Sequence, residues 1–263
     1  MTLAARGLRY GFRDRVVGEQ VDFALAPGEI ACVLGPNGSG KTTLLRTLLG
    51  LLPALAGEVT LDGKPLHAWP TRERATRIAY VPQASESYFD FTLRETVEMG
   101  RTAHHGVFAS ASARDREQAA HALERMGLAA LAERPIQRVS GGERQLALIA
   151  RALATEAPHL LMDEPAASLD FGNQALILEE LSALRGAGTA VLFSTHHPDH
   201  ALRIADRAIL IKAGRAMASG PAGEVLNREN LSALYGRPIE VATVTSPDGT
   251  PRRVCVPLGT GHR

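Results

Sequence analysis

The chain has 263 residues, of which 45% are hydrophobic and 22% are charged, and its formal net charge is +1. This length is enough for one large α/β domain with additions or for two small domains. The near-zero charge argues against a basic surface that would bind nucleic acid or an anionic membrane, so we expect no nucleic-acid partner. Two cysteines, Cys32 and Cys255, are too few for a disulfide framework.

The sequence also lacks the usual membrane and secretion signals. No apolar stretch approaches the ~18 residues of a transmembrane helix. No apolar run follows a basic amino-terminal segment, as it would in a signal peptide. We therefore expect a soluble, cytoplasmic protein that would reach a membrane only through a partner.

The first 49 residues predict strands, a loop and a helix in that order. Up to residue 25, apolar and polar residues mostly alternate, which is typical of strands joined by turns. A turn at residues 26–29 leads to the apolar run 30–34, which has the pattern of a buried strand. Residues 43–49 can form a helix, so the intervening loop joins a strand to a helix.

That loop contains a phosphate-binding motif. It fits G-x-x-x-x-G-K-[ST], the P-loop pattern, with Gly35, Pro36, Asn37, Gly38, Ser39, Gly40, Lys41, Thr42 and Thr43. Glycines let backbone N–H groups point inward, and the helix amino terminus adds the positive end of its dipole. Lys41 would reach the β- and γ-phosphates of a nucleotide, and the Thr42 hydroxyl would bind Mg²⁺. A glycine-rich turn without a ligand is disfavoured, because strand, loop, Lys-Thr pair and helix all agree.

The rest of the chain predicts more strands and helices. Short strands are expected at residues 58–61, which end in the hairpin-type turn Asp62-Gly63, and at 78–83. Helical composition follows at about 92–131, interrupted by a loop at 104–108, and resumes at 142–154. Strands at 159–162, 189–194 and 208–212, with a helix at 174–185, favour a parallel sheet with helices on its faces. The fold class is therefore α/β, with an N-terminal antiparallel β part.

Two adjacent carboxylates, Asp163 and Glu164, follow the strand at residues 159–162. A strand that ends in this way has the form of a Walker B motif. Asp163 would hold the Mg²⁺ shell, and Glu164 would orient and deprotonate the attacking water. Gln83, just past its own strand, could bind Mg²⁺ or the water. The alternative, a solvated acidic turn, is disfavoured by the P-loop upstream.

A more specific motif lies between Gln83 and the Walker B pair. It reads Val139-Ser140-Gly141-Gly142-Glu143-Arg144-Gln145. With it, the chain resembles the ATP-binding subunit of ABC transporters over almost its whole length. The resemblance assigns four residues to the family's signature: Ser140, Gly141, Gly142 and Glu143. It also assigns Gln83 to the Q-loop, Ser168 and Asp170 to the D-loop, and His196 to the switch histidine.

The signature implies a dimer. A serine hydroxyl and two glycine N–H groups at a helix start form a second anion site, which one nucleotide in one subunit does not need. In the family, two copies associate head to tail, and each ATP lies between one P-loop and the opposite signature. We therefore expect an ATP-driven homodimer.

The chain departs from the family pattern at a few positions. Val139 replaces the commoner Leu and Glu143 the commoner Gln, and neither change touches the Ser-Gly-Gly anion site. The aromatic that stacks on adenine is often Tyr in the family. Here Phe12 fits best by its spacing to the next strand, Tyr10 is the alternative, and either could instead belong to the core.

Several histidines raise the question of a metal site. The strand at 189–194 is followed by four residues that could suggest a metal site: His196, His197, Asp199 and His200. The family position of the switch histidine accounts for His196 and disfavours that interpretation. His104 and His105 are expected to be loop or interface residues.

Three stretches resemble ATPases of type II importers, which take up iron-siderophores, haem, cobalamin or molybdate. They are residues 91–104 with Gly106 and Phe108, residues 169–174, and residues 229–236, followed by a predicted strand pair turning at Asp248-Gly249. The resemblance implies Mg²⁺ with ATP as substrate, two transmembrane permease subunits and, indirectly, a substrate-binding protein. It places the chain at the cytoplasmic face of the inner membrane. The alternative is a soluble ABC ATPase acting in assembly or repair, but the coiled coil, zinc-binding cysteines or second P-loop typical of that class are missing from the sequence.

Domain boundaries follow from the same reading. We expect residues 1–226 to form the ATPase domain, with a helical subdomain inserted at about 85–137, and residues 227–263 to form a small C-terminal extension. The segment from Gln83 to about Thr102 would form the groove that, in the family, receives a short cytoplasmic helix of the permease. Its apolar residues favour an interface, although a buried anchor is the alternative for some of them: Tyr88, Phe89, Phe91, Leu93 and Met99.

Overall fold

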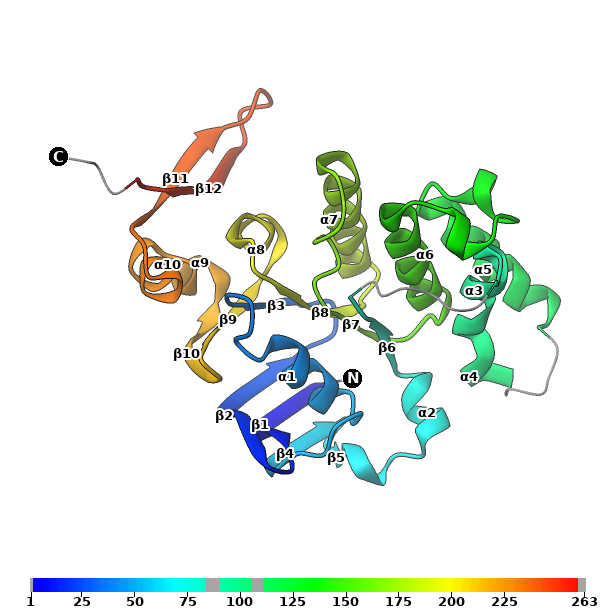
Figure 1. The fold of residues 1–263 in the computed structure, drawn as a ribbon, viewed down its shortest axis with the longest axis horizontal. Coiled ribbons are helices and arrows are strands. Elements are labelled where there is room, and N and C mark those ends of the chain that lie inside the picture. Colours follow the sequence, from blue (N-terminus) through cyan, green and yellow to red (C-terminus); the bar gives the residue numbers. More distant parts are fainter. Residues whose placement is uncertain (1, 84–89, 106–110, 260–263) are drawn as a thin grey trace.

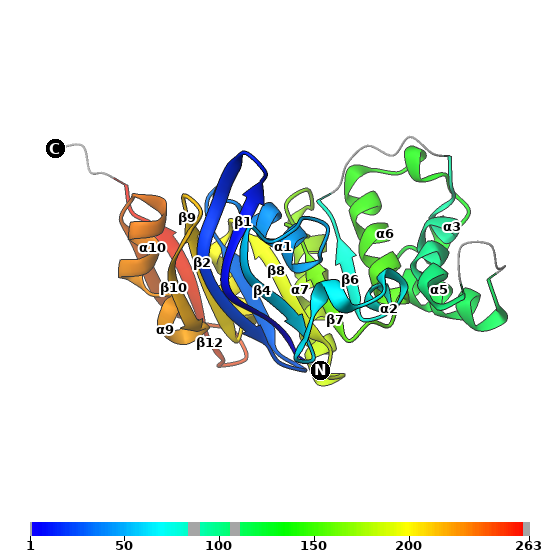
Figure 2. The ribbon, with the colours of Figure 1, turned by 90° about the horizontal axis from the view of Figure 1, so that it is seen from below.

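The computed structural model describes residues 2–83, 90–105 and 111–259. Figures 1 and 2 show a large sheet with helical regions at its two ends. The strands are β1 (Leu3–Phe12), β2 (Arg15–Leu25), β3 (Ile30–Leu34), β4 (Ala56–Leu61), β5 (Lys64–Pro65), β6 (Ile78–Val81), β7 (His159–Met162), β8 (Ala190–Thr195), β9 (Arg207–Lys212), β10 (Arg215–Pro221), β11 (Ile239–Thr245) and β12 (Pro251–Pro257). The α-helices are α1 (Lys41–Leu48), α2 (Thr71–Ala75), α3 (Leu93–Glu98), α4 (Thr102–His105), α5 (Ala113–Arg125), α6 (Gly141–Ala154), α7 (Phe171–Gly186), α8 (Pro198–Ile204), α9 (Ala222–Val225) and α10 (Arg228–Tyr235). Short 3₁₀ turns are η1 (Leu66–Ala68), η2 (Met99–Arg101), η3 (Ala129–Leu131) and η4 (Ile136–Arg138).

The large sheet combines a parallel and an antiparallel part. Its strand order is β5-β4-β1-β2-β10-β9-β3-β8-β7-β6. Strands β9, β3, β8, β7 and β6 are parallel neighbours, and every residue of β3 is buried, as expected for a strand covered on both faces. Strand β1 pairs antiparallel with β2 and β4. The predicted α/β class, including its antiparallel N-terminal part, is confirmed.

Three helices, α3, α5 and α6, pack together beyond β6 at one end of the molecule (Figures 1 and 2). Each begins with a capping box, in which a hydroxyl accepts a backbone N–H three residues on and an acidic side chain accepts in return. The pairs are Thr92–Glu95, Ser112–Asp115 and Ser140–Glu143. Such caps stabilise a helix start by about 1 kcal/mol, so short helices can form here between loops.

The C-terminal elements lie at the opposite end of the molecule, where α9 and α10 contact β9 and β10 (Figure 1). Helices α9 and α10 lead to the hairpin of β11 and β12, and β12 contacts α8. The hairpin turns at Asp248-Gly249, as predicted, where Gly249 has a φ of +82° that favours glycine. Among the described residues, no helix is both long enough and apolar enough to span a bilayer.

One local prediction was wrong. His104 and His105 were expected in a loop but form the end of α4. His104 Nε2 lies 2.8 Å from the carbonyl oxygen of Thr155, and Arg72 donates hydrogen bonds to the carbonyls of Ala103 and His104. These contacts hold the turn in helical form, while residues 106–108 of the predicted loop lie outside the described part of the chain.

Other elements were missed or shortened in the prediction. Helices α2 and α8 and strand β10 are too short to show a clear periodicity. Helix α7 starts three residues before the expected residue 174, because the Asp170 side chain caps it by accepting the Asn173 N–H at 2.8 Å.

Candidate nucleotide-binding and hydrolysis site

The predicted P-loop joins β3 to α1, and its glycines are required by close contacts. A Cβ on Gly35 would lie 2.3 Å from the carbonyl oxygen of Ile211, and one on Gly40 would lie 2.8 Å from a methyl carbon of Val17. Gly38 and Gly40 also have positive φ values of 77° and 100°. Only glycine fits these positions without strain, and the loop therefore exposes backbone N–H groups toward its interior.

Lys41 points its ammonium group back into this loop. Its Nζ donates to the carbonyl oxygens of Gly35 (2.8 Å) and Pro36 (3.2 Å), and it lies 3.0 Å from Glu164 Oε1. The side chain is only 5% exposed. The Ser39 hydroxyl is buried as well, and within the described residues it has no hydrogen-bond partner. A buried cation and a free buried donor suit the phosphates of a nucleotide.

The two Walker B carboxylates are oriented by a residue that the motif analysis missed. Ser194, in β8, donates its hydroxyl hydrogen to Asp163 Oδ1 at 2.7 Å and accepts the Glu164 N–H at 3.0 Å. Glu164 has a φ of +47°, a conformation that costs a non-glycine residue about 1–3 kcal/mol and is found mostly at functional sites. The only local signal for Ser194 is that it and Thr195 are polar residues that end the otherwise apolar strand β8.

Glu164 is held by a hydrogen bond or ion pair at each of its two oxygens. Oε1 faces Lys41, and Oε2 lies 2.9 Å from Nδ1 of His196. Partial burial raises the pKa of Glu164, but Lys41 and His196 outweigh burial, so the pKa lies below its usual value. Glu164 is therefore ionised at neutral pH, and the Nδ1 of His196 carries the hydrogen of their bond.

The predicted magnesium ligands lie beyond the carboxyl ends of three strands of the parallel part of the sheet, β3, β7 and β6. Thr42 lies in the first turn of α1, and Asp163 follows β7. Gln83 follows β6, whose last residue Val81 accepts the Asp163 N–H at 2.9 Å. Hydroxyl, amide and carboxylate oxygens are ligands that Mg²⁺ prefers. In the described residues, no group of three or more His, Cys, Asp or Glu side chains is placed to hold a metal ion.

The predicted signature forms the amino terminus of α6. Ser140 caps the helix, and Glu143 Oε2 accepts the Ser140 N–H at 2.7 Å, which lowers the pKa of Glu143. No atom lies within 4 Å of a Cβ built on Gly141, so this turn is open to a ligand. A Cβ on Gly142 would lie 3.4 Å from Leu169 of the predicted D-loop. Signature and D-loop are thus in contact, and Ser168 and Asp170 beside Leu169 are exposed.

The two candidate stacking aromatics differ in exposure. Phe12 is 50% exposed, whereas Tyr10 is fully buried beneath the P-loop and β2. Burial raises the pKa of Tyr10 to about 12. Only Phe12 therefore offers a π-face to a ligand, and its role in stacking stays a prediction.

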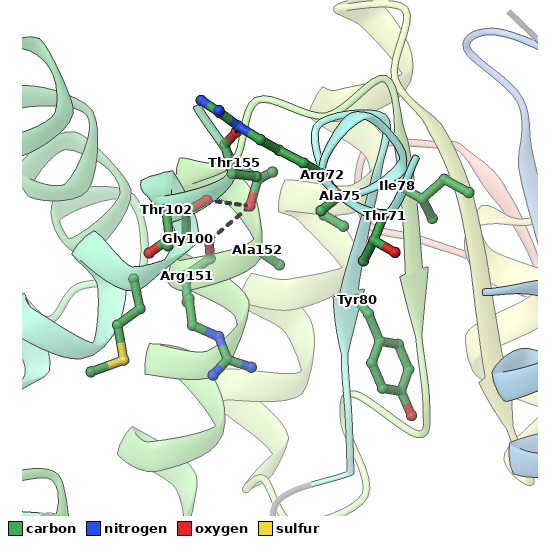
Figure 3. A pocket seen from close by; sticks show the side chains of 13 residues that line it. Thr71, Arg72, Ala75, Ile78, Tyr80, Gly100, Thr102, Arg151, Ala152 and Thr155 are labelled. Carbon is green, nitrogen blue, oxygen red and sulfur yellow. Dashed lines mark hydrogen bonds between the residues drawn. The ribbon is translucent and has the colours of Figure 1, made fainter. Parts of the chain in front are cut away.

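A separate pocket of about 680 Å³ lies where α2, β6, η2 and α6 meet. Figure 3 shows Thr71, Arg72 and Tyr80 on one side and Gly100, Arg151 and Thr155 on the other. The Thr155 hydroxyl donates to the carbonyls of Gly100 (3.2 Å) and Arg151 (3.4 Å), which joins η2 to the end of α6. We call this pocket the α2–α6 groove.

The residues predicted for the permease groove divide between core and surface. Met99 lines the α2–α6 groove and is 40% exposed. Leu93 is fully buried in the helical cluster, so for this residue the buried-anchor alternative applies. Phe91 is 39% exposed but does not line the groove. Tyr88 and Phe89 lie outside the described residues.

Comparisons with known proteins agree on one family. The family model described as ABC transporter matches residues 19–167. A hemin import ATP-binding protein of Streptomyces coelicolor is 40% identical, over 90% of this chain and 84% of that protein. An iron(3+)-hydroxamate import ATP-binding protein of Bacillus subtilis is 36% identical, over 97% and 94%.

Solved structures give the same result. A metal-chelate type ABC transporter in an inward-facing conformation has a TM-score of 0.86 and 32% identity, covering 98% of both chains. An ATP-binding cassette solved as a dimer with ADP and phosphate has a TM-score of 0.73 and 26% identity, over 84% of this chain and 98% of that one.

Proposed function

This chain belongs to the ABC transporter family and is an ATPase, and on that premise we propose that it drives the import of a metal chelate or an oxyanion. The substrate class is that of iron-siderophore, haem, cobalamin or molybdate importers. The observation that supports the motor role is the Lys41–Glu164–His196 chain of contacts, because a carboxylate suited to act as a general base lies beside the phosphate loop. The similarity to hemin and hydroxamate import subunits supports the substrate class.

We infer the following division of roles in hydrolysis. The P-loop backbone, Ser39 and Lys41 would bind the β- and γ-phosphates. Glu164, ionised and held at both oxygens, would accept a proton from the attacking water. His196, bonded to Glu164 through Nδ1, would keep that carboxylate oriented and present its second nitrogen to the γ-phosphate.

Thr42, Asp163 and Gln83 would hold Mg²⁺. When bound, this ion neutralises phosphate charge that develops during transfer. The buried Asp163 is kept in place by the Ser194 hydroxyl. Phosphate binding would draw Lys41 away from Glu164, which would leave one oxygen of that carboxylate free to contact the water.

The open Ser140-Gly141-Gly142 turn would bind the γ-phosphate of ATP held by a second copy, and the exposed D-loop residues Ser168 and Asp170 would lie in the same interface. The resulting homodimer would act on two permease subunits at the cytoplasmic face of the inner membrane. A substrate-binding protein would deliver the substrate to these permease subunits. Within each copy we propose a helical subdomain at about residues 85–137 and an extension from residue 227.

We place the permease contact at the α2–α6 groove. Its lining is mostly apolar and includes Met99, and Arg72 and Arg151 also line it. A short permease helix with an apolar face and an acidic residue would fit both features. Because β6 forms one wall and ends two residues before Gln83, movement at Gln83 would shift the groove.

Substrate uptake in proteoliposomes, with the permease that co-purifies with the chain, tests this proposal. We expect ATP-dependent uptake of iron supplied as haem or as a ferric hydroxamate, and its loss in Met99→Lys without loss of ATP affinity. Met217→Lys is the matched control, because Met217 is equally exposed but lies on β10. Purification of an active ATPase with no permease would favour the soluble alternative, and full uptake by Met99→Lys would move the contact elsewhere.

A further inference from the structure

The loop that carries His196 is held by residues from outside the ATPase motifs. The hydroxyl of Tyr235 donates a hydrogen bond to the backbone carbonyl oxygen of His196 at 2.7 Å. Tyr235 is the last residue of α10, which lies beside β9 and β10, at the opposite end of the molecule from the signature helix (Figure 1). A residue in the C-terminal extension thus contacts the backbone of a residue that hydrogen-bonds Glu164.

The Tyr235 hydroxyl is itself firmly placed. Helix α10 is capped by Asn227, which accepts the Asn230 N–H at 2.8 Å, and Leu231 and Leu234 on its inner face are buried. The helix ends at Gly236 in the left-handed conformation, with a φ of +66°. Burial raises the pKa of Tyr235, so its hydroxyl stays protonated and acts as a donor at physiological pH.

A second hydrogen bond holds the chain just after His196, at Asp199. The N–H of Cys255, in β12, donates to Asp199 Oδ1 at 2.7 Å, and Asp199 belongs to the first turn of α8. The Thr195 hydroxyl oxygen accepts the His197 N–H at 3.0 Å, which tightens the turn between the two hydrogen bonds. Strand β8, α10 and β12 therefore fix the loop at three points.

These hydrogen bonds can affect hydrolysis because they set the orientation of the His196 imidazole. A hydrogen bond to the His196 carbonyl fixes the plane of the peptide that follows His196, and with it the orientation of its side chain. The Nδ1–Glu164 distance of 2.9 Å depends on that orientation. A misplacement of about 1 Å at a reacting group can lower a rate a hundredfold, so a loss of this hydrogen bond has a measurable consequence.

We propose that the C-terminal extension positions the switch histidine, and that Tyr235 is the positioning residue through which it does so. The Tyr235 hydroxyl contacts the backbone of His196, so Tyr235 acts through His196. Asp199 has the same kind of role, exercised through the start of α8. This inference rests on the proposed function, since it requires His196 and Glu164 to serve hydrolysis.

The test is the hydrolysis rate of Tyr235→Phe, which keeps the ring and removes only the hydroxyl. We expect kcat for ATP to fall about tenfold, which corresponds to about 1.4 kcal/mol, while KM and ATP affinity stay unchanged because the P-loop is not touched. Asn227→Ala is the matched control. It removes the cap at the other end of α10 and lowers the melting temperature, but it leaves the hydroxyl in place and kcat unchanged.

The same substitution in a His196→Ala background separates positioning from general damage. If Tyr235 acts through His196, Tyr235→Phe has no further effect on single-turnover hydrolysis of labelled ATP there. A tenfold loss that persists in that background, a normal kcat in the single variant, or an equal loss in Asn227→Ala would each overturn the inference. If His196→Ala and Glu164→Gln both hydrolyse ATP normally, the proposed hydrolytic site is wrong, whatever Tyr235 does.

Discussion

Two buried ion pairs in this chain use similar groups for different purposes. In the candidate hydrolysis site Lys41 lies 3.0 Å from Glu164, and between η2 and α5 Arg101 Nε lies 2.9 Å from Asp115. Both cations are only 5% exposed. The two pairs differ in the elements that supply their other hydrogen-bond partners: helical segments for Arg101, and the P-loop and His196 for Lys41 and Glu164.

The Arg101–Asp115 pair has further partners in the helical segments around it. Its guanidinium also donates to the Ala154 carbonyl (2.8 Å) and to Glu156 (2.7 Å), and the second oxygen of Asp115 accepts the N–H and hydroxyl of Ser112. These bonds join η2, α5 and the end of α6. Lys41 and Glu164, in contrast, hold each other at the place where phosphate and water would bind. The contacts of the Arg101 pair link elements of the fold, whereas the partners of Lys41 and Glu164 would be exchanged when a nucleotide and water bind.

The largest effect we expect is on stability, from Arg101→Ala. Removing the cation leaves Asp115 as a buried charge, which costs about 3–5 kcal/mol. Urea denaturation measures the difference. Arg94→Ala is the control, because the Arg94–Glu133 pair is exposed and its loss should cost less than about 1 kcal/mol. Similar small losses in both variants would show that the Arg101 cluster is not the fixed element we describe.

Glu164→Gln should produce the largest change in rate. It keeps the size of the side chain but removes the proton acceptor, so we expect hydrolysis to fall at least about a hundredfold. ATP binding should persist, because Lys41 loses its competing carboxylate and is freer for phosphate. Steady-state hydrolysis and nucleotide titration measure the two effects, with the exposed Glu179→Gln as control. A normal rate would remove Glu164 from the mechanism.

Ser194→Ala should have an intermediate effect. The variant loses the hydrogen bond to Asp163 and leaves the Glu164 N–H without its acceptor, a change of about 1–3 kcal/mol. We expect kcat to fall about tenfold, and Ser194→Thr to restore part of it. Ser182→Ala removes a serine hydroxyl that bonds only within α7 and should leave kcat unchanged. An unaffected kcat in Ser194→Ala would mean that the carboxylates are held by other contacts.

The smallest effect concerns pH. Hydrogen bonds from Ser112 and from Arg101 lower the pKa of Asp115 in the folded state, so its stabilisation is complete above the unfolded pKa of about 4 and is lost as pH falls. The stability difference between the wild type and Asp115→Asn should therefore narrow by about 1 kcal/mol between pH 7 and pH 3. Chemical denaturation across that range measures it. A difference that stays constant with pH would show that Asp115 is not a depressed carboxylate.

The sequence predicted the parts of the site that depend on short motifs. The P-loop, the Asp163-Glu164 pair and the signature each bring their chemistry within a few neighbouring residues, so their placement at strand and helix ends could be foreseen. Ser194 and Tyr235 could not, since each acts on a residue 30 or more positions away in the chain. The positive φ of Glu164 likewise depends on the fold around it and leaves no mark on the residue pattern.

Burial was equally hard to foresee in the helical subdomain. Leu93 and Met99 are both apolar residues on neighbouring turns, yet Leu93 is fully buried and Met99 lines the α2–α6 groove. The last two residues of α4, His104 and His105, were wrongly predicted as loop, because His104 is held by Thr155 and Arg72, which are 51 and 32 residues away in the chain. Long-range contacts, rather than local propensity, decided these cases.

The central claim is that the site is complete only when the signature of a second copy joins the P-loop. Light scattering on Glu164→Gln, with and without Mg-ATP, tests this claim directly. We predict the mass of the 28.0 kDa chain without nucleotide and twice that mass with it. Adding Gly141→Val, which places a side chain in the open turn of the signature, should return the measured mass to that of the monomer, even with Mg-ATP. A single mass for Glu164→Gln at saturating Mg-ATP would contradict the claim.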